Sequence, residues 1–190
     1  MNKRQKAIRD KHPGYIMSAA EWEYATDDYK HLRKNKKMKN TQFKEYQIRK
    51  IQLKDKEQWE KLYRGYADFY KVEMNDKILQ NVWNWLHDKS HEVSGLVYEI
   101  NGNIVGLAHY RKMPSPLRGK DIGFLDDLFV EPKYRGKKIG EKILNELKKI
   151  SKSKGWNLIR WITHDDNLRA KALYDRVAEK TKWDVYELSS

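Results

Sequence analysis

Residues 124–140 have the sequence Phe124-Leu-Asp-Asp-Leu-Phe-Val-Glu-Pro-Lys-Tyr-Arg-Gly-Lys-Lys-Ile-Gly140. The apolar run, interrupted by two aspartates, predicts a buried strand over residues 122–130. A basic turn containing Gly136 follows, and apolar residues at helical spacing predict a helix over residues 138–154. Such a turn presents unpaired backbone N–H groups at the positive end of a helix, which favours a phosphate or pyrophosphate. An ordinary surface turn is the alternative, since neither a P-loop nor a GxGxxG motif is present.

Patterns on either side of this segment predict the element order β-α-α-β-β-β-α-β-α-β. Asp55, with Gln58 three residues later, predicts a capping box at the start of the first helix. Asn101-Gly102 between two β-rich runs predicts a hairpin turn. The order predicts an α/β (α+β) fold, in which helices flank a mixed central sheet. The predicted strands cover residues 46–53, 96–100, 104–111, 122–130, 158–163 and 183–188, the predicted helices residues 55–70, 78–86, 138–154 and 167–177, and a predicted loop residues 112–120.

Composition limits the classes of protein that this chain can be. The 190 residues include 40 Lys or Arg and 27 Asp or Glu, which gives a net charge of +13 and points to an anionic partner. The absence of cysteine excludes disulfides, a thiolate zinc site and a cysteine nucleophile. No apolar run is long enough for a membrane span, and no secretory signal precedes the chain's first predicted element, so a cytoplasmic protein is expected.

The positive charge is concentrated near the N-terminus. Residues 1–50 carry 14 basic and 6 acidic side chains. We therefore divide the chain into a basic extension over residues 1–44, partly helical or disordered, and one domain over residues 45–190. The extension is either a solubilising tail or an arm that contacts RNA.

The turn and the segments after it resemble the GNAT superfamily of acetyl-coenzyme A-dependent N-acetyltransferases. The family signature is Gln/Arg-x-x-Gly-x-Gly/Ala, of which Arg135 and Gly140 match, while Lys138 stands at the first signature glycine. Asn167 and Tyr174 are similar to the family's cofactor-contacting Asn and to its Tyr near the thioester sulfur. The resemblance covers roughly residues 45–190 and is strongest for small histone and polyamine acetyltransferases. It implies the GNAT fold and transfer of an acetyl group from acetyl-coenzyme A to a primary amine.

The resemblance also implies how the cofactor is bound. Strand backbone at Leu128–Val130 would hydrogen-bond the pantetheine arm, and the turn from Arg135 to Gly140 would hold the pyrophosphate. No metal is implied. The expected cofactor-binding residues are Leu128, Phe129, Val130, Arg135, Gly136, Lys137, Lys138, Ile139, Gly140, Asn167 and Tyr174.

Two residues are expected to move protons. Asp126 matches the family's catalytic Glu and would act as the base, through a water because Asp is one methylene shorter. Tyr174 would be the acid for the departing thiolate. Successive strand residues face opposite ways, so we expect only one of Asp126 and Asp127 to face the pocket. A carboxylate paired with a basic side chain is the alternative for either.

The acceptor is expected to be a small cationic amine or a protein lysine. The residues expected at the acceptor site are Tyr66, Tyr70, Glu73, Asp126 and His109. The rival hypothesis is a non-catalytic or nucleic-acid-binding module that uses the basic residues to contact phosphates. The sequence is also compatible with a homodimer.

Lys138 is the clearest departure from the family pattern. A glycine at this position can take a positive φ or approach the pyrophosphate closely. Lysine has a Cβ, so we expect an ordinary helical φ at Lys138 rather than a strained turn with an altered pocket.

Overall fold

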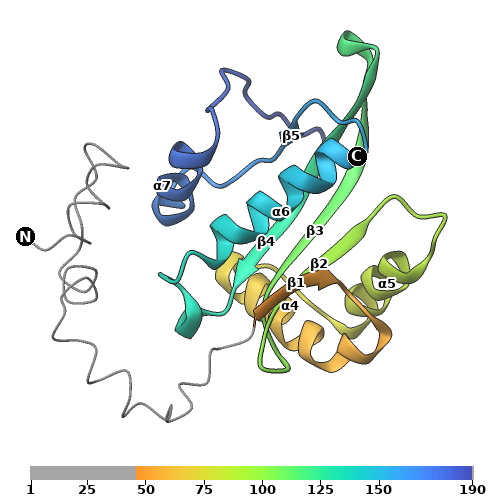
Figure 1. Cartoon of the computed structure of the whole chain (residues 1–190), viewed down its shortest axis with the longest axis vertical. Helices are drawn as coiled ribbons and strands as arrows, with labels where there is room; N and C mark the ends of the chain where they lie inside the picture. Colours follow the sequence, from red (N-terminus) through yellow and green to blue (C-terminus); the bar gives the residue numbers. More distant parts are fainter. Residues whose placement is uncertain (1–45, 190) are drawn as a thin grey trace, which may run out of the picture. The chain divides into compact units, whose positions relative to one another are not determined.

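The computed structural model describes residues 46–189, and they form one sheet with four helices (Figure 1). The sheet order is β1-β2-β3-β4-β5; all neighbours are antiparallel except β4 and β5, which are parallel. This confirms the predicted mixed α/β fold. The elements are β1 Tyr46–Lys50, α4 Lys56–Tyr70, α5 Asp76–His87, β2 Ser94–Ile100, β3 Asn103–Ser115, β4 Lys120–Val130, α6 Ile139–Ser153, β5 Ile159–Arg160 and α7 Leu168–Val177.

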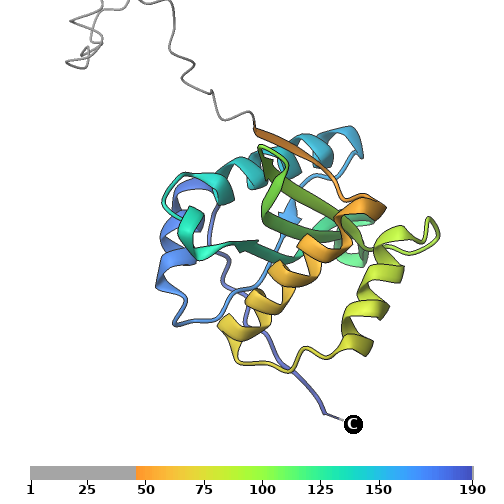
Figure 2. The same ribbon diagram turned by 90° about the horizontal axis from the view of Figure 1, so that it is seen from below.

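The sheet lies between two helical layers. Figure 2 shows α4 and α5 on one side of the strands and α6 on the other. On the first side, Trp59 and Leu79 pack against the strand residue Leu107, and all three are almost fully buried. On the second side, Ile143 and Leu147 of α6 pack against other strand residues. Apolar side chains alternate between the two faces of the central strands, which accounts for a core on both.

The β2–β3 hairpin forms as predicted, whereas the following loop is shorter than predicted. Asn101 and Gly102 have φ values of 50° and 81°, as a two-residue turn of this kind requires. The loop predicted over residues 112–120 is wrong, because β3 continues to Ser115 and β4 already begins at Lys120. Pro114 does not end β3, because the strand pairs with β4 through its other residues.

The predicted capping box at Asp55 is also wrong. The Asp55 carboxylate makes no cap hydrogen bond to α4; it accepts hydrogen bonds from the Gln52 backbone and from both terminal nitrogens of Arg49. Gln58 instead accepts a hydrogen bond from the backbone of Ile104. A buried carboxylate is stabilised more by a guanidinium than by a backbone amide alone. The Asp55 side chain therefore pairs with Arg49 and does not cap α4.

The C-terminal part of the sheet is smaller than predicted. β5 has two residues instead of the six predicted, and residues 183–188 form no strand. Trp183 and Tyr186 are exposed on this last segment. Because β5 has only two residues, it offers a further strand very few backbone hydrogen bonds and side-chain pairs. The alternating pattern of residues 183–188 is therefore not enough to place them in the sheet.

None of the helices formed by residues 46–189 combines the length and apolar character that crossing a bilayer requires. The predicted extension over residues 1–44 lies outside the described residues.

Candidate active site

A bulge in β4 determines which side chains reach the α4 side of the sheet. His109 pairs with Asp127 and Tyr110 with Leu125, which leaves Asp126 as the extra residue in β4. A bulge bends its strand and interrupts the alternation of side chains. Asp127 then bonds His109, and Asp126 bonds Arg111, two residues along the same face of β3. Both aspartates therefore lie on the α4 side, and the expectation that they face opposite ways is wrong.

Beyond the bulge, β4 and β5 separate. They pair only at Gly123–Ile159 and Phe124–Arg160. From Leu125 to Val130, β4 has no partner strand on its β5 side among residues 46–189. Apart from the Val130 carbonyl, which accepts from Arg135, the backbone N–H and C=O groups on this edge must therefore bind water or a ligand.

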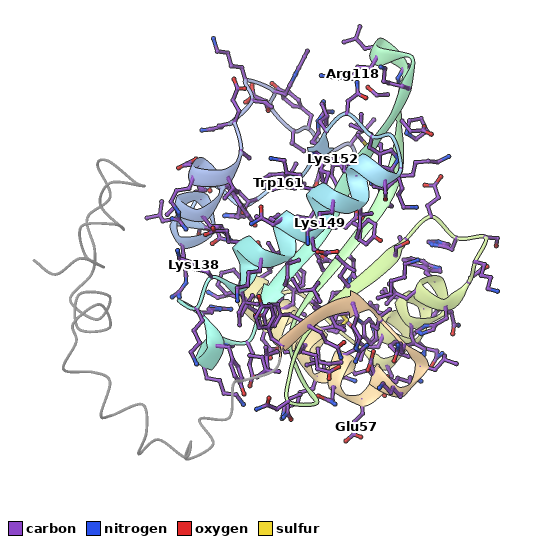
Figure 3. The ribbon with its side chains drawn as sticks, viewed as in Figure 1. Glu57, Arg118, Lys138, Lys149, Lys152 and Trp161 are labelled. Carbon is purple, nitrogen blue, oxygen red and sulfur yellow. The ribbon has the colours of Figure 1, made fainter. Side chains whose placement is uncertain are left out.

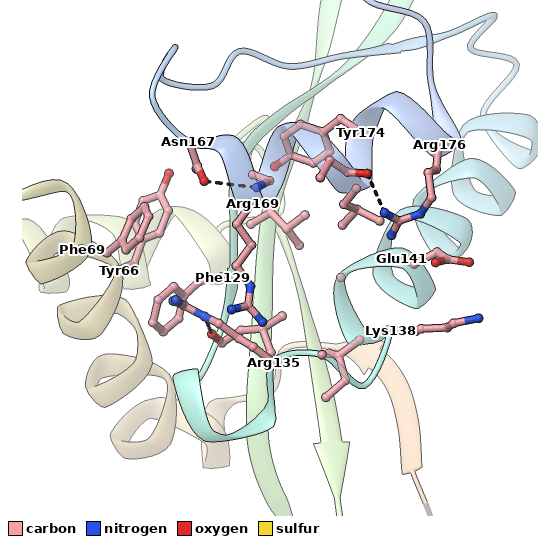
Figure 4. Close-up of a pocket in the computed structure, with 18 of the residues that line it drawn as sticks. Tyr66, Phe69, Phe129, Arg135, Lys138, Glu141, Asn167, Arg169, Tyr174 and Arg176 are labelled. Atoms are coloured by element: carbon pink, nitrogen blue, oxygen red, sulfur yellow. Dashed lines mark hydrogen bonds between the residues drawn. The ribbon is translucent and has the colours of Figure 1, made fainter.

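A cavity of about 480 Å³ opens where the strands separate (Figure 4). Three elements form it: the end of α4, the β4–α6 segment, and α7. Phe129 contributes to its apolar floor, and the signature turn closes one end. Of the expected cofactor residues, all but Lys137 line the cavity: Leu128, Phe129, Val130, Arg135, Gly136, Lys138, Ile139, Gly140, Asn167 and Tyr174.

Lys138 does not have the helical φ that we expected. Its φ is 59° and its ψ 19°, in the left-handed region, and Gly136 two residues earlier has a φ of 83°. Alternating backbone handedness turns successive N–H groups into one hollow, which is how backbone nests bind anions. Lys138 thus adopts the conformation that a glycine would allow, at a cost of about 1–2 kcal/mol. The turn is strained, yet Lys138 remains part of the cavity wall.

The second signature glycine is needed for packing. A Cβ on Gly140 would lie 3.1 Å from Cδ2 of Leu173, closer than ordinary van der Waals contact. The small residue lets α7 approach the first turn of α6, and this approach forms the cavity wall.

Positive charge surrounds the phosphate-binding end of the cavity. Arg135, Arg169 and Arg176 line it together with Lys138, against one acidic residue, Glu141. Arg135 donates to the carbonyl of Val130 and lies over the rings of Phe69 and Phe129. Burial, together with the neighbouring Arg169, lowers the pKa of Arg135.

The donors around this end fit a polyphosphate. The α6 N-terminus has no side-chain cap bond, so its first amides are free to donate to an anion. Sequence reasoning did not assign Arg169 or Arg176 to the site. The signal was available: the helix that follows Asn167 carries a basic residue in its first turn, Arg169, and another in its last turn, Arg176.

Asn167 and Tyr174 occupy the wall formed by α7. The Asn167 side chain accepts from the Ala170 N–H as a helix cap and donates to the hydroxyl of Tyr70. Tyr174 packs edge-on against Trp161, with ring centroids 5.2 Å apart. Burial raises the pKa of Tyr174 to about 12, with a contribution from Tyr70. Its hydroxyl therefore keeps its proton at neutral pH.

Asp127 is the centre of a buried hydrogen-bond network. The indole N–H of Trp59 donates to Nε2 of His109 at 2.9 Å, and an indole can only donate. His109 therefore carries its proton on Nδ1, which donates to Asp127 at 2.8 Å, and Tyr63 donates to the same oxygen at 3.1 Å. Burial alone would raise the pKa of Asp127, but these donors and the Tyr66 hydroxyl hold it below its ordinary value.

Asp126 has the opposite electrostatic environment. Burial raises its pKa, against the opposing effect of Arg111, whose Nε donates to Oδ1 at 3.0 Å. Oδ2 is buried and has no hydrogen-bond partner among the described residues. Neighbouring carboxyl groups with pKa values pushed apart are typical of sites that assign different roles to similar groups.

The residues expected at the acceptor site are not all brought together. Tyr66 and Tyr70 line the cavity near its α4 wall. Glu73 is exposed after α4 and accepts from Asn75, and His109 is only 2% exposed with both ring nitrogens bonded. Neither contributes to the cavity wall, and Asp126, the fifth residue expected at the acceptor site, is not among the lining residues either. His164 pairs with Asp165 and Asp166 in an exposed loop.

Comparisons with known proteins agree with this geometry. The model of the acetyltransferase (GNAT) family matches residues 59–178. A D-amino-acid N-acetyltransferase, HPA3, of Saccharomyces cerevisiae is 28% identical over 142 residues, which are 74% of this chain and 88% of that protein. A thialysine N-epsilon-acetyltransferase of Bos taurus is 37% identical over 71 residues, which are 37% of this chain and 41% of that protein.

Solved structures show the same fold. A ribosomal-protein-alanine N-acetyltransferase from Brucella melitensis biovar Abortus 2308 superposes with a TM-score of 0.66 at 20% identity, over 77% of this chain and 99% of that chain. The aminoglycoside N-acetyltransferase AAC(6')-Iy in complex with CoA gives a TM-score of 0.65 at 16% identity, over 77% and 95%.

Proposed function

The chain belongs to the GNAT family of acetyltransferases and uses acetyl-coenzyme A, and we propose that it acetylates the primary amine of a small molecule. One observation supports a small acceptor over a protein lysine. The free oxygen of Asp126 is recessed below the surface, so the acceptor must enter the site rather than lie on it. Two relatives are named as N-acetyltransferases of D-amino acids and of thialysine, and these names support an amino group as the target.

Acetyl-coenzyme A supplies an acetyl group activated as a thioester. We assign the diphosphate to the signature turn with Arg135, Arg169 and Arg176, where cations and free amides meet. The open edge of β4 at Leu128–Val130 would orient the pantetheine arm through backbone hydrogen bonds. The apolar cavity floor would exclude water from the thioester.

Two protons must move during transfer. The amine must lose one before or during attack, and the departing thiolate must gain one. Asp126 would accept the first through a water, because its Oδ2 is buried and its raised pKa makes it a stronger base than an ordinary aspartate. Tyr174 would donate the second, since it is protonated at neutral pH and lines the cavity.

The test is an acetylation assay on a panel of amines, in which turnover is measured as the release of the free coenzyme A thiol. The panel contains amino acids, lysine analogues, polyamines and a lysine-containing peptide. We expect turnover with the small amines and little with the peptide. Tyr174→Phe should lower kcat and leave acetyl-coenzyme A affinity unchanged.

Two results would contradict the proposal. Turnover on the peptide alone would replace the small-molecule acceptor with a protein lysine. An unchanged kcat for Tyr174→Phe, under conditions where chemistry limits turnover, would reduce Tyr174 to a packing role.

A further inference from the structure

Arg111 is a cation beside the proposed base, Asp126, that the mechanism above does not use; neither residue is among those that line the cavity. Its Nε donates to Asp126 Oδ1, and its guanidinium lies 4.9 Å above the ring of Phe124. Its two terminal nitrogens have no partner among the described residues. The side chain is 32% exposed, so a ligand can reach it.

The Arg111–Asp126 pair presents two complementary charges side by side. Their single mutual bond leaves the terminal nitrogens of Arg111 without a partner among the described residues. It also leaves Oδ2 of Asp126 unpaired, but this oxygen is buried, so an ammonium would reach it through a water. A guanidinium fork binds a carboxylate through two parallel hydrogen bonds, and a carboxylate binds an ammonium. The pair therefore matches a molecule that carries a carboxylate close to its amine.

The same pair is poorly suited to a polycation. Arg111 neutralises Asp126, and the charge of Asp127 is taken up by donors from His109 and Tyr63. Glu73, which would have added negative charge, is exposed after α4 and accepts a hydrogen bond from Asn75. Little uncompensated negative charge remains to attract a second or third ammonium group.

We infer that Arg111 determines acceptor specificity by binding a carboxylate, and that the acceptor is an amino acid whose amine and carboxylate lie on the same or adjacent carbons. This inference rests on the proposed N-acetyltransferase function. Phe124 fixes the plane of the guanidinium, and the β4 bulge brings Asp126 beside it. Arg111 thus orients the acceptor while Asp126 receives the proton.

The experiment compares acceptors that differ only in the carboxylate. Kinetic constants are measured for alanine against ethylamine and for phenylalanine against phenylethylamine, with both enantiomers of each amino acid. We expect the native chain to favour the amino acid in kcat/KM by about 10–100-fold, the usual value of a charge-assisted hydrogen bond. Arg111→Gln should abolish this preference by raising KM for the amino acid.

Matched variants separate the carboxylate contact from other effects. Arg111→Lys keeps the positive charge beside Asp126 but loses the fork, so it should recover only part of the preference. Lys112→Gln removes the same charge from the neighbouring residue, which is half-exposed and paired with Asp121 at 3.6 Å, and should leave the preference intact. Melting temperature and acetyl-coenzyme A affinity should be unchanged in all three.

Each contrary outcome has a distinct meaning. If Arg111→Gln lowers kcat/KM equally for amino acids and simple amines, Arg111 only positions Asp126 and the inference is wrong. Preference for polyamines by the native chain would also overturn it while leaving the acetyltransferase function intact. Failure to acetylate any amine, with acetyl-coenzyme A bound, would count against the proposed function itself.

Discussion

The two adjacent aspartates of β4 show how one strand gives similar residues different roles. Asp126 has a raised pKa and a free oxygen, while Asp127 has a lowered pKa and accepts from His109 and Tyr63. Asp126 therefore has the properties of a base, and Asp127 those of a structural anion. The two carboxylates differ in their partners rather than in the side of the sheet they occupy.

Exchanging each aspartate for asparagine should separate these roles. Asp126→Asn should reduce kcat/KM by about 10²–10⁴-fold and remove the acidic limb of its pH profile. That limb should lie above the pH at which an ordinary aspartate titrates, because burial raises the pKa of Asp126. The melting temperature of Asp126→Asn should hardly change, because burial already disfavours the charged carboxylate of Asp126 in the native state.

Asp127→Asn should mainly reduce stability, by about 1–3 kcal/mol, since it weakens two partly buried hydrogen bonds. The folded pKa of Asp127 is depressed, so its contribution is present above the unfolded pKa and is lost as pH falls through the folded one. Denaturant unfolding at pH 7 and at low pH measures this. If Asp127→Asn, and not Asp126→Asn, removed the acidic limb, the assignment of the base would be reversed.

Part of this residue-level arrangement could be predicted from sequence. The position of the strand and the candidate base followed from the pattern around residues 124–130. The bulge could not be predicted, because it depends on the register between β3 and β4, which local sequence does not determine. The burial of His109 depends likewise on Trp59, 50 residues earlier in the chain.

At the level of elements, strongly periodic segments were predicted well and chain ends poorly. The predicted helix over residues 138–154 agrees closely with α6, because one face of Ile139, Ile143 and Leu147 is buried. The predicted last strand failed because its partner, β5, is too short to pair with it. Lys138 shows the same dependence on context: its φ is set by the turn that it completes and not by its own preference.

The turn before α6 gives a direct test of stored strain. Lys138→Gly should raise the free energy of unfolding by about 1 kcal/mol, because glycine takes a positive φ without a Cβ clash. The expected rise in melting temperature is about 2–4 °C. The KM for acetyl-coenzyme A should rise modestly, because one positive charge is lost beside the diphosphate.

Lys137→Gly is the matched control, since it removes the same charge from a residue whose φ is not positive. It should raise KM by a similar amount but lower stability, because glycine adds only flexibility there. Equal stability changes in the two variants would show that Lys138 stores no strain.

For the whole molecule, the net charge of +13 and the four cations around the cavity favour an anionic ligand. Figure 3 also shows Lys149 and Lys152 on the outer surface of α6, at a distance from the turn that carries Lys138. Charge on that outer surface is available to a different partner. Contact of residues 1–44 with RNA and formation of a homodimer stay predictions.

Acetyl-coenzyme A should stabilise the folded chain by mass action. At a concentration 100-fold above Kd, a ligand that binds only the native state adds about 2.7 kcal/mol. For a chain of this size, that corresponds to a rise in melting temperature of about 5–10 °C. Desulfo-coenzyme A should raise the melting temperature similarly and adenosine should not, because the cations of the cavity bind the phosphates. A flat thermal-shift titration up to millimolar acetyl-coenzyme A would contradict the assignment of the cavity.

Because β5 pairs with β4 over only two residues, the domain contains regions of different local stability. β3 and β4 are paired along ten residues each, whereas β5 is attached to β4 through two. Amide hydrogens of β3 should therefore exchange with solvent only on global unfolding, while those of β5 and α7 exchange through a local opening. A ligand that touches both the β4 edge and α7 bridges the two regions. Binding of this ligand should slow amide exchange most in α7. The ligand would then make α7 and β5 unfold together with the rest of the domain.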